Sequence, residues 1–238
     1  MLWAADYEKA LSYFEKAVKK DTRYADAFSK IGICNYKLGH YVEAIDGFKQ
    51  AIRIKPDDGK AQYNLGVAYA DMGRNAEAIE AFKQAIRIEP DFAEAHDRLG
   101  IAYYELGRYR EAIEAHKQAV RIKPDNAYMH SRLGVDYFQL KRYKEAIEAF
   151  KQVIRIKPDF AEAHAGLGSA YAGLRRASEA IDAYKQAIRI KPDYTDVYYL
   201  LGQIYLITGD KGSALDQYKI LKNLDNDLAN QLFNLIYK

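Results

Sequence analysis

The fold is decided by a stretch of 34 residues, 93–126, which reads AEAHDRLGIAYYELGRYREAIEAHKQAVRIKPDN. Its first half repeats packing residues at the i, i+3, i+4, i+7 spacing of one helical face, namely His96, Leu99, Gly100 and Tyr103. Gly107 then stands where a helix commonly ends in a residue with positive φ. This half therefore predicts a helix that ends in a tight turn.

The second half of the stretch predicts another helix. Its packing residues are Ala112, Ile113, His116, Ala119 and Val120. The pattern stops before Pro124, because the residue preceding a proline disfavours the α region. The unit is thus a helix, a turn, a second helix and a Pro-Asp turn.

The prolines show that this unit is repeated. The chain has 5 prolines, each 34 residues from the next: Pro56, Pro90, Pro124, Pro158 and Pro192. When the chain is aligned on these prolines, six full units result: residues 25–58, 59–92, 93–126, 127–160, 161–194 and 195–228. Such units bury their apolar faces by stacking, so we predict a single solenoid domain over residues 1–238.

The two ends hold partial units. Residues 1–24 match the second helix of a unit, and we expect this unpartnered helix to expose Trp3, Tyr13 or their neighbours. Residues 229–238 match the start of another unit, but Ile236 replaces the close-packing glycine. We therefore predict a C-terminal capping helix with Asn230, Gln231 and Asn234 facing outward.

The unit resembles the tetratricopeptide repeat family over nearly the whole chain. The resemblance is carried by the five prolines and by Leu65-Gly66, Leu99-Gly100, Leu133-Gly134, Leu167-Gly168, Leu201-Gly202, by Tyr69, Tyr103, Tyr137, Tyr171, Tyr205, and by Ala44, Ala78, Ala112, Ala146, Ala180, Ala214. The first unit departs from it with Ile31-Gly32 and Asn35, and the sixth with Asn226 in place of proline. The resemblance implies an all-α fold, a right-handed superhelical α-solenoid of antiparallel helix pairs with a concave and a convex surface.

The turn inside the unit carries glycine in most repeats. Gly39, Gly73 and Gly209 match Gly107, whereas Lys141 and Arg175 occupy this place in two units. If those two residues adopt positive φ, each costs about 1 kcal/mol relative to glycine.

Composition narrows the class of protein. A content of 49% hydrophobic and 29% charged residues is typical of a folded soluble protein, and no window approaches the roughly 18 apolar residues of a membrane span. A net charge of +3 argues against a dedicated nucleic-acid binder. The single Cys34 forms no internal disulfide, and no signal peptide is visible, so a cytoplasmic location is the default expectation.

No catalytic or metal-binding motif is visible. The sequence contains no G-x-x-x-x-G-K-[ST] phosphate-binding loop, no G-x-S-x-G nucleophile elbow and no H-E-x-x-H zinc-binding helix. The segment nearest to a glycine-rich phosphate loop, Gly166-Leu167-Gly168, lies inside a predicted helix. His96, His130 and His164 recur in one position of successive units, but packed helices lie about 8 to 10 Å apart and metal ligands must converge within about 2 Å. We interpret them as flat packing residues, with a pH-sensitive contact between His96 and His116 as the alternative. We expect no catalysis, no cofactor and no metal.

The second helices carry acids at their starts and bases at their ends, for example Glu111 and Arg121. This arrangement complements the helix dipole and keeps the outer face hydrated. A basic ridge that binds anionic lipid or RNA is the alternative, but acids interrupt it and stacking aromatics are missing from it.

The first helices carry a second apolar stripe beside their packing stripe. The family resemblance implies that these positions line the concave groove, with an aliphatic and aromatic floor and mixed charged walls. Such a surface suits an extended or helical peptide. The predicted peptide-binding residues are Lys30, Ile33, Tyr36, Lys37, Tyr63, Asn64, Val67, Asp71, Asp97, Arg98, Ile101, Tyr104, Glu105, Arg132, Val135, Phe138 and Gln139. For Tyr104 and Phe138 the alternative is packing against adjacent first helices.

One binding mode of the family fits poorly. Chaperone-binding members hold a C-terminal carboxylate with Lys, Asn and Arg from three units. Asn64 and Arg98 match two of those positions, but Ser29 and Ile33 stand in the first unit and Glu94 replaces a lysine in the third. We do not expect a carboxylate clamp.

These observations predict a non-enzymatic protein–protein interaction module that binds a peptide segment of a partner. One alternative is a self-assembling scaffold, in which copies associate through residues 1–24 and the C-terminal helix or through the convex face. Another is the targeting region of a larger enzyme.

Overall fold

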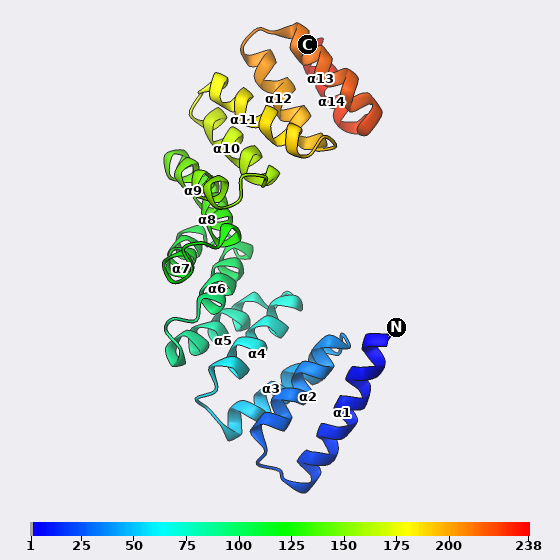
Figure 1. Ribbon diagram of the computed structural model, residues 1–238, viewed down its shortest axis with the longest axis vertical. Coiled ribbons are helices and arrows are strands. Elements are labelled where there is room, and N and C mark those ends of the chain that lie inside the picture. Colours follow the sequence, from blue (N-terminus) through cyan, green and yellow to red (C-terminus); the bar gives the residue numbers. More distant parts are fainter. Residues whose placement is uncertain (1) are drawn as a thin grey trace. The chain divides into compact units, whose positions relative to one another are not determined.

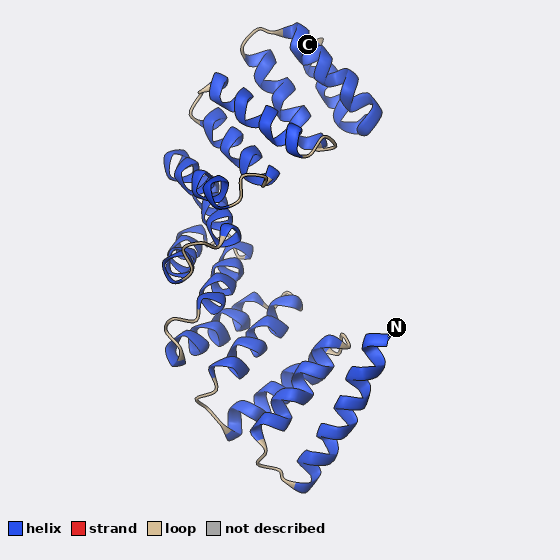
Figure 2. Cartoon of the chain, viewed as in Figure 1, coloured by secondary structure: helices blue, strands red, loops and turns tan. Residues whose placement is uncertain are grey.

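The computed structural model describes the backbone of residues 2–238 and the side chains of residues 4–238. Over these residues the regular secondary structure is helical, and Figure 2 shows helices and loops without a strand. The described residues form fourteen helices. The prediction of an all-α fold is therefore confirmed. The chain divides into two compact units, Met1–Pro124 (unit 1) and Asp125–Lys238 (unit 2). The single solenoid domain over residues 1–238 stays a prediction.

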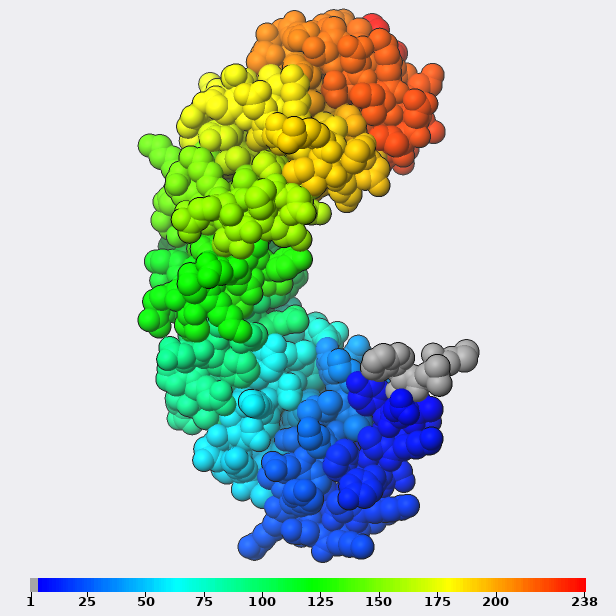
Figure 3. All heavy atoms as spheres, in the orientation of Figure 1, coloured from blue at the N-terminus to red at the C-terminus, as the bar shows by residue number. Residues whose placement is uncertain are grey.

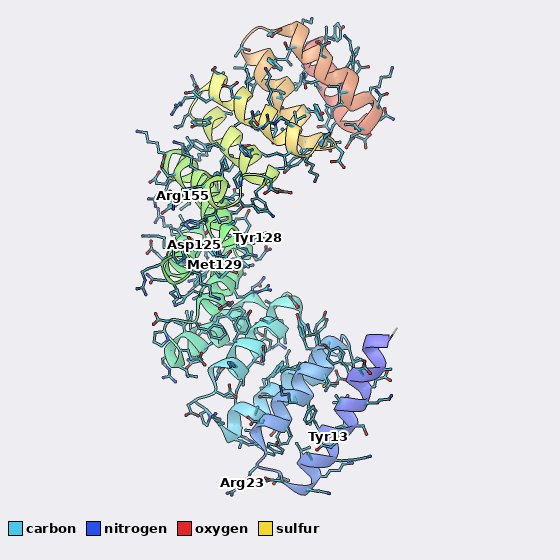
Figure 4. The ribbon with its side chains drawn as sticks, viewed as in Figure 1. Tyr13, Arg23, Asp125, Tyr128, Met129 and Arg155 are labelled. Carbon is cyan, nitrogen blue, oxygen red and sulfur yellow. The ribbon has the colours of Figure 1, made fainter. Side chains whose placement is uncertain are left out.

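Unit 1 contains one unpaired helix followed by three helix pairs (Figure 1). The helices are α1 (Leu2–Lys20), α2 (Ala25–Lys37), α3 (Tyr41–Ile54), α4 (Gly59–Asp71), α5 (Asn75–Ile88), α6 (Ala93–Glu105) and α7 (Tyr109–Ile122). Within a pair the helices are antiparallel, and α3 and α5 pack on the first helices of the pairs that follow them, α4 and α6. Tyr13 of α1 (Figure 4) is 71% exposed, as expected, whereas the side chain of Trp3 lies outside the described residues.

Unit 2 contains three helix pairs and a final helix. The helices are α8 (Ala127–Gln139), α9 (Tyr143–Ile156), α10 (Ala161–Gly173), α11 (Ala177–Ile190), α12 (Thr195–Ile207), α13 (Lys211–Leu224) and α14 (Asn226–Ile236). Tyr128, at the start of α8 (Figure 4), packs edge to face against Phe160 at 5.4 Å. In both units successive pairs follow one another in sequence order, without interleaving (Figure 3).

Repeat positions are numbered 1 to 34 from residues 25, 59, 93, 127, 161 and 195. Position 8 is glycine because the two helices of a pair touch there. A Cβ atom on Gly66 would lie 2.6 Å from Cε1 of Phe82, the position 24 residue of the same repeat. Phe48, Phe150 and Tyr184 fill position 24 elsewhere, and His116 does so in the third repeat.

The turn inside each repeat adopts the left-handed backbone that its glycines indicate. Gly39, Gly73, Gly107 and Gly209 have positive φ. Lys141 has φ 58° and Arg175 has φ 59°, so both residues adopt the positive φ for which the cost relative to glycine was given above.

The histidines at position 4 bond to backbone. Nε2 of His96 lies 2.9 Å from the Pro90 carbonyl, and Nε2 of His164 lies 3.0 Å from the Pro158 carbonyl. The Tyr198 hydroxyl, at the same position, donates to the Pro192 carbonyl at 3.1 Å. These side chains therefore tie the first helix of a repeat to the Pro-Asp turn before it.

Helix α14 covers the last helix pair. A Cβ atom on Gly202 would lie 2.6 Å from Leu232, so α14 supplies the contact that position 24 makes in earlier repeats. Asn230, Gln231 and Asn234 are exposed, as the capping prediction expects. None of the described helices combines the length and the apolar character that crossing a bilayer requires.

Candidate peptide-binding surface

Three consecutive first helices of unit 1, α2, α4 and α6, present equivalent positions side by side. Adjacent members of this set contact each other within the unit. Positions 6, 9, 12 and 13 of each helix therefore form rows that cross the three helices. We call these rows the first-helix surface of unit 1, formed by Lys30, Ile33, Tyr36, Lys37, Asn64, Val67, Ala70, Asp71, Arg98, Ile101, Tyr104 and Glu105.

The position 6 row consists of side chains with hydrogen-bond donors. Lys30 and Arg98 are exposed, and Asn64 is half-buried. Among the described residues, the structure shows no hydrogen bond or ion pair from these three side chains. Two cations and one amide are thus open to a ligand.

The position 9 row is aliphatic. Ile33, Val67 and Ile101 are each half-buried, and the first two pack against the core of unit 1. Their inner atoms stabilise the stack, while their outer atoms give the surface an apolar floor.

Tyr36 joins two first helices through a hydrogen bond. Its hydroxyl on α2 donates to Oδ2 of Asp71 on α4. Burial of the ring, followed by the bond to Asp71, raises the pKa of Tyr36 to about 12, and the charge of Arg98 on α6 acts in the opposite direction. Residues of all three first helices therefore act on one hydroxyl.

Aromatic residues at position 12 pair with a tyrosine at position 17 of the same repeat. The ring centroids lie 5.6 Å apart in Tyr36–Tyr41 and 5.2 Å apart in Tyr104–Tyr109, both edge to face. Tyr104 is half-buried and packs against the core of unit 1. Its ring therefore packs and still presents part of its area to the surface.

Two predicted site residues turn toward the interior of unit 1. Tyr63 packs against Phe82 and Phe92, with ring centroids 5.9 and 4.9 Å away. Asp97 is only 7% exposed, and its Oδ1 lies 3.9 Å from Nε2 of the buried His116. Little of Asp97 is accessible to a peptide.

In unit 2, α8 carries four of the predicted site residues. Arg132, Val135 and Phe138 are half-buried, and Gln139 is exposed. The ring centroids of Phe138 and Tyr143 lie 5.5 Å apart, edge to face, as in the two tyrosine pairs of unit 1.

In unit 1, Glu94 stands where the carboxylate clamp of chaperone-binding relatives has a lysine. It forms an ion pair with Lys123.

A cavity in unit 2 was not predicted from the sequence. It has a volume of about 460 Å³ and is lined by Ala172, Gly173, Arg175, Ala177, Ile204 and Ile207. The sequence feature that could have indicated this cavity is a pair of alanines, Ala172 and Ala177, at positions 12 and 17 of the fifth repeat. The third and fourth repeats carry aromatic residues at these positions.

Solved structures of known proteins share this fold. One structure of MamA is 30% identical to this chain and covers 68% of it and 95% of its own chain, with a TM-score of 0.66. A second MamA structure is 28% identical and covers 71% of this chain and 92% of its own, with a TM-score of 0.68. The C-terminal part of a TPR repeat-containing protein from Cytophaga hutchinsonii reaches a TM-score of 0.80 at 20% identity, covers 93% of this chain and 91% of its own, and shows the fold alone.

The comparison with curated proteins finds no match. Family models match most of the chain. The model described as TPR repeat matches residues 35–73, 68–107, 101–135, 134–174 and 176–209, and the model described as tetratricopeptide repeat matches residues 195–227. With helix pairs that repeat every 34 residues and these matches over most of its length, the chain belongs to the tetratricopeptide repeat family.

Proposed function

We propose that this chain is a non-enzymatic interaction module, and that the first-helix surface of unit 1 binds a peptide segment of a partner protein. The observation that carries the proposal is the row of unbonded donors Lys30, Asn64 and Arg98 beside the aliphatic row. Apolar floor residues supply contact area, while donors at a fixed spacing orient a peptide through its carbonyl or carboxylate oxygens.

The test is a peptide selected from a displayed random library on the full chain, with its affinity measured by calorimetry. Arg98→Glu reverses one of the two positive charges in the position 6 row, and we expect it to weaken binding at least tenfold. The matched control is Arg87→Glu, an exposed arginine of α5 on a second helix. Equal affinities of R98E and the unchanged chain for every selected peptide would contradict the proposal.

Tyr104→Ala and Arg132→Glu extend the test to an aromatic residue of unit 1 and to α8 of unit 2. We expect either change to weaken a peptide that uses the corresponding residue, with the helical circular dichroism unchanged. Loss of the Tyr104 ring removes contact area, and the change at Arg132 reverses a charge. Affinity insensitive to both changes, and to R98E, would leave the predicted residues without a role in binding.

Self-association is a second candidate function, favoured by the exposure of α1 and α14. Phe14 and Ala17 of α1 are half-buried, whereas the equivalent residues of α3, Phe48 and Ala51, are 1% and 0% exposed. Phe233 of α14 and Tyr237, which follows the helix, are also exposed. Light scattering over a wide concentration range tests this candidate, and a constant monomer mass would remove it.

A further inference from the structure

The cavity in unit 2 lies where three helices meet. Ala172 and Gly173 end α10, Arg175 follows in the turn, Ala177 begins α11, and α12 supplies Ile204 and Ile207. Its volume of about 460 Å³ is within the range of small-ligand pockets. Every lining residue belongs to unit 2.

In the fourth repeat, aromatic rings occupy the positions that are equivalent to Ala172 and Ala177 of the cavity lining. There, the ring of Tyr143 at position 17 covers position 13 of the next repeat, because a Cβ atom on Gly173 would lie 2.7 Å from Tyr143 Cε1. Phe138 at position 12 packs edge to face on that ring. Positions 12 and 17 together thus hold two aromatic rings over the following first helix.

One repeat later, both ring positions carry alanine. Ala172 replaces the position 12 aromatic and Ala177 replaces the position 17 tyrosine. The residue that a position 17 ring would cover is now Ile207, which is 77% exposed. The cavity is therefore a site for an aromatic ring that this repeat does not supply.

Two other cavities in unit 2 are not comparable. They are lined mainly by the same repeat positions, one in the fourth repeat around His130 and Tyr137 and one in the fifth around His164 and Tyr171. Their recurrence makes them a general property of stacked repeats. The cavity beside Ile207 depends on residues that differ from those of the two preceding repeats.

The charge around the cavity is positive. Arg175 is exposed, and its side chain makes no ion pair or hydrogen bond with the described residues. No acidic residue lines the cavity. A guanidinium beside an apolar cavity complements a carboxylate next to an apolar group.

We propose that this cavity binds an aromatic side chain of a partner peptide whose carboxylate, from a neighbouring acidic residue or the chain end, pairs with Arg175. The inference deepens the proposed function, since it takes the occupant to be a peptide. It does not depend on the first-helix surface of unit 1, because the two sites share no residue.

The test uses the full chain labelled for NMR and two small probes, N-acetyl-L-tryptophan, which carries a carboxylate, and its neutral amide. We expect saturable shifts of the Gly173 and Ala177 amides and the Ile207 methyl groups, with the neutral amide at least threefold weaker. Arg175→Ala should abolish the difference between the probes. Shifts confined to α2, α4 and α6 would support the proposed function and overturn this inference.

Filling the cavity provides a second readout. The double change Ala172→Phe and Ala177→Tyr copies the Phe138–Tyr143 pair and should weaken the acidic probe at least tenfold, while Ala177→Ser keeps the cavity and should bind normally. Unchanged binding to the filled variant would overturn the proposal. If the filled variant does not fold, the comparison of the two probes on R175A decides, and equal binding of both probes to the unchanged chain would overturn the pairing with Arg175.

Discussion

At the scale of single residues, Tyr36 reports on the candidate surface of unit 1. Its hydroxyl bonds to Asp71 across two helices, and burial together with this bond raises its pKa to about 12. Since the unfolded value is about 10, the contribution to stability is complete below about pH 10 and is lost as the pH rises through about 12.

Asp71→Asn should therefore lower the pKa of Tyr36 from about 12 toward about 10, because it removes the negative charge that disfavours the phenolate. The titration can be followed by NMR on the labelled tyrosine ring carbon and assigned with Tyr36→Phe. Asp26→Asn, an exposed change on the same helix, serves as the control. A pKa that stays near 12 in D71N would contradict the role of this hydrogen bond.

We expect the histidine at position 116 to be required by its buried neighbour, Asp97. The first, second, fourth and fifth repeats carry Phe or Tyr at this buried position. In the third repeat, Nε2 of His116 lies 3.9 Å from Oδ1 of Asp97. His116→Phe should lower the free energy of unfolding by about 1–3 kcal/mol, because a ring without nitrogen then faces a buried carboxylate. Adding Asp97→Ala should recover most of the loss in urea unfolding. Equal stabilities of H116F and H116F/D97A would show that the two side chains are not coupled.

At the scale of elements, the turns between paired helices offer a direct test of backbone strain. Lys141 holds φ 58° where four other repeats carry glycine. Lys141→Gly should raise the free energy of unfolding by about 1 kcal/mol, and the reverse change Gly107→Lys should lower it by about as much. Both are measured by urea denaturation. No gain in K141G would mean that the lysine side chain offsets the strain.

Helix α14 packs against α12 through the contact between Leu232 and Gly202. Leu232 is fully buried against Gly202, whereas Leu235 on the same helix is exposed. Leu232→Ala should therefore cost about 2–5 kcal/mol, and Leu235→Ala should cost much less. Similar losses in the two variants would mean that α14 does not cap α12 through Leu232.

At the scale of the whole molecule, the contacts between the described helices of each unit join near neighbours along the chain. In such arrays stability is the sum of local terms. In L232A, hydrogen exchange should therefore quicken in α12, α13 and α14 while the amides of α2 to α5 keep their protection. Exchange that quickens equally in both units would show cooperative unfolding of the entire chain instead.

The repeat unit, its helices and its turns could be predicted from the amino-acid sequence alone. A period of 34 residues places the same local pattern in every unit, and local patterns specify helices, glycine turns and proline stops without knowledge of distant contacts. The structure adds that Lys141 and Arg175, which replace glycine in two units, also have positive φ. The candidate rows on α2, α4 and α6 could be located because repeat positions translate directly into helix faces.

Which of those residues are accessible depends on how the helices pack, and the sequence pattern does not show this. Tyr63 and Asp97 share a repeat position with different neighbours, and one packs between two phenylalanines while the other faces His116. Likewise, the cavity beside Ile207 is open because Ala172 and Ala177 of the fifth repeat supply no ring to cover α12, whereas Tyr143 covers Gly173 one repeat earlier. Such contacts join residues about 20 to 30 positions apart. The size of each side chain decides whether the space between them is filled or open.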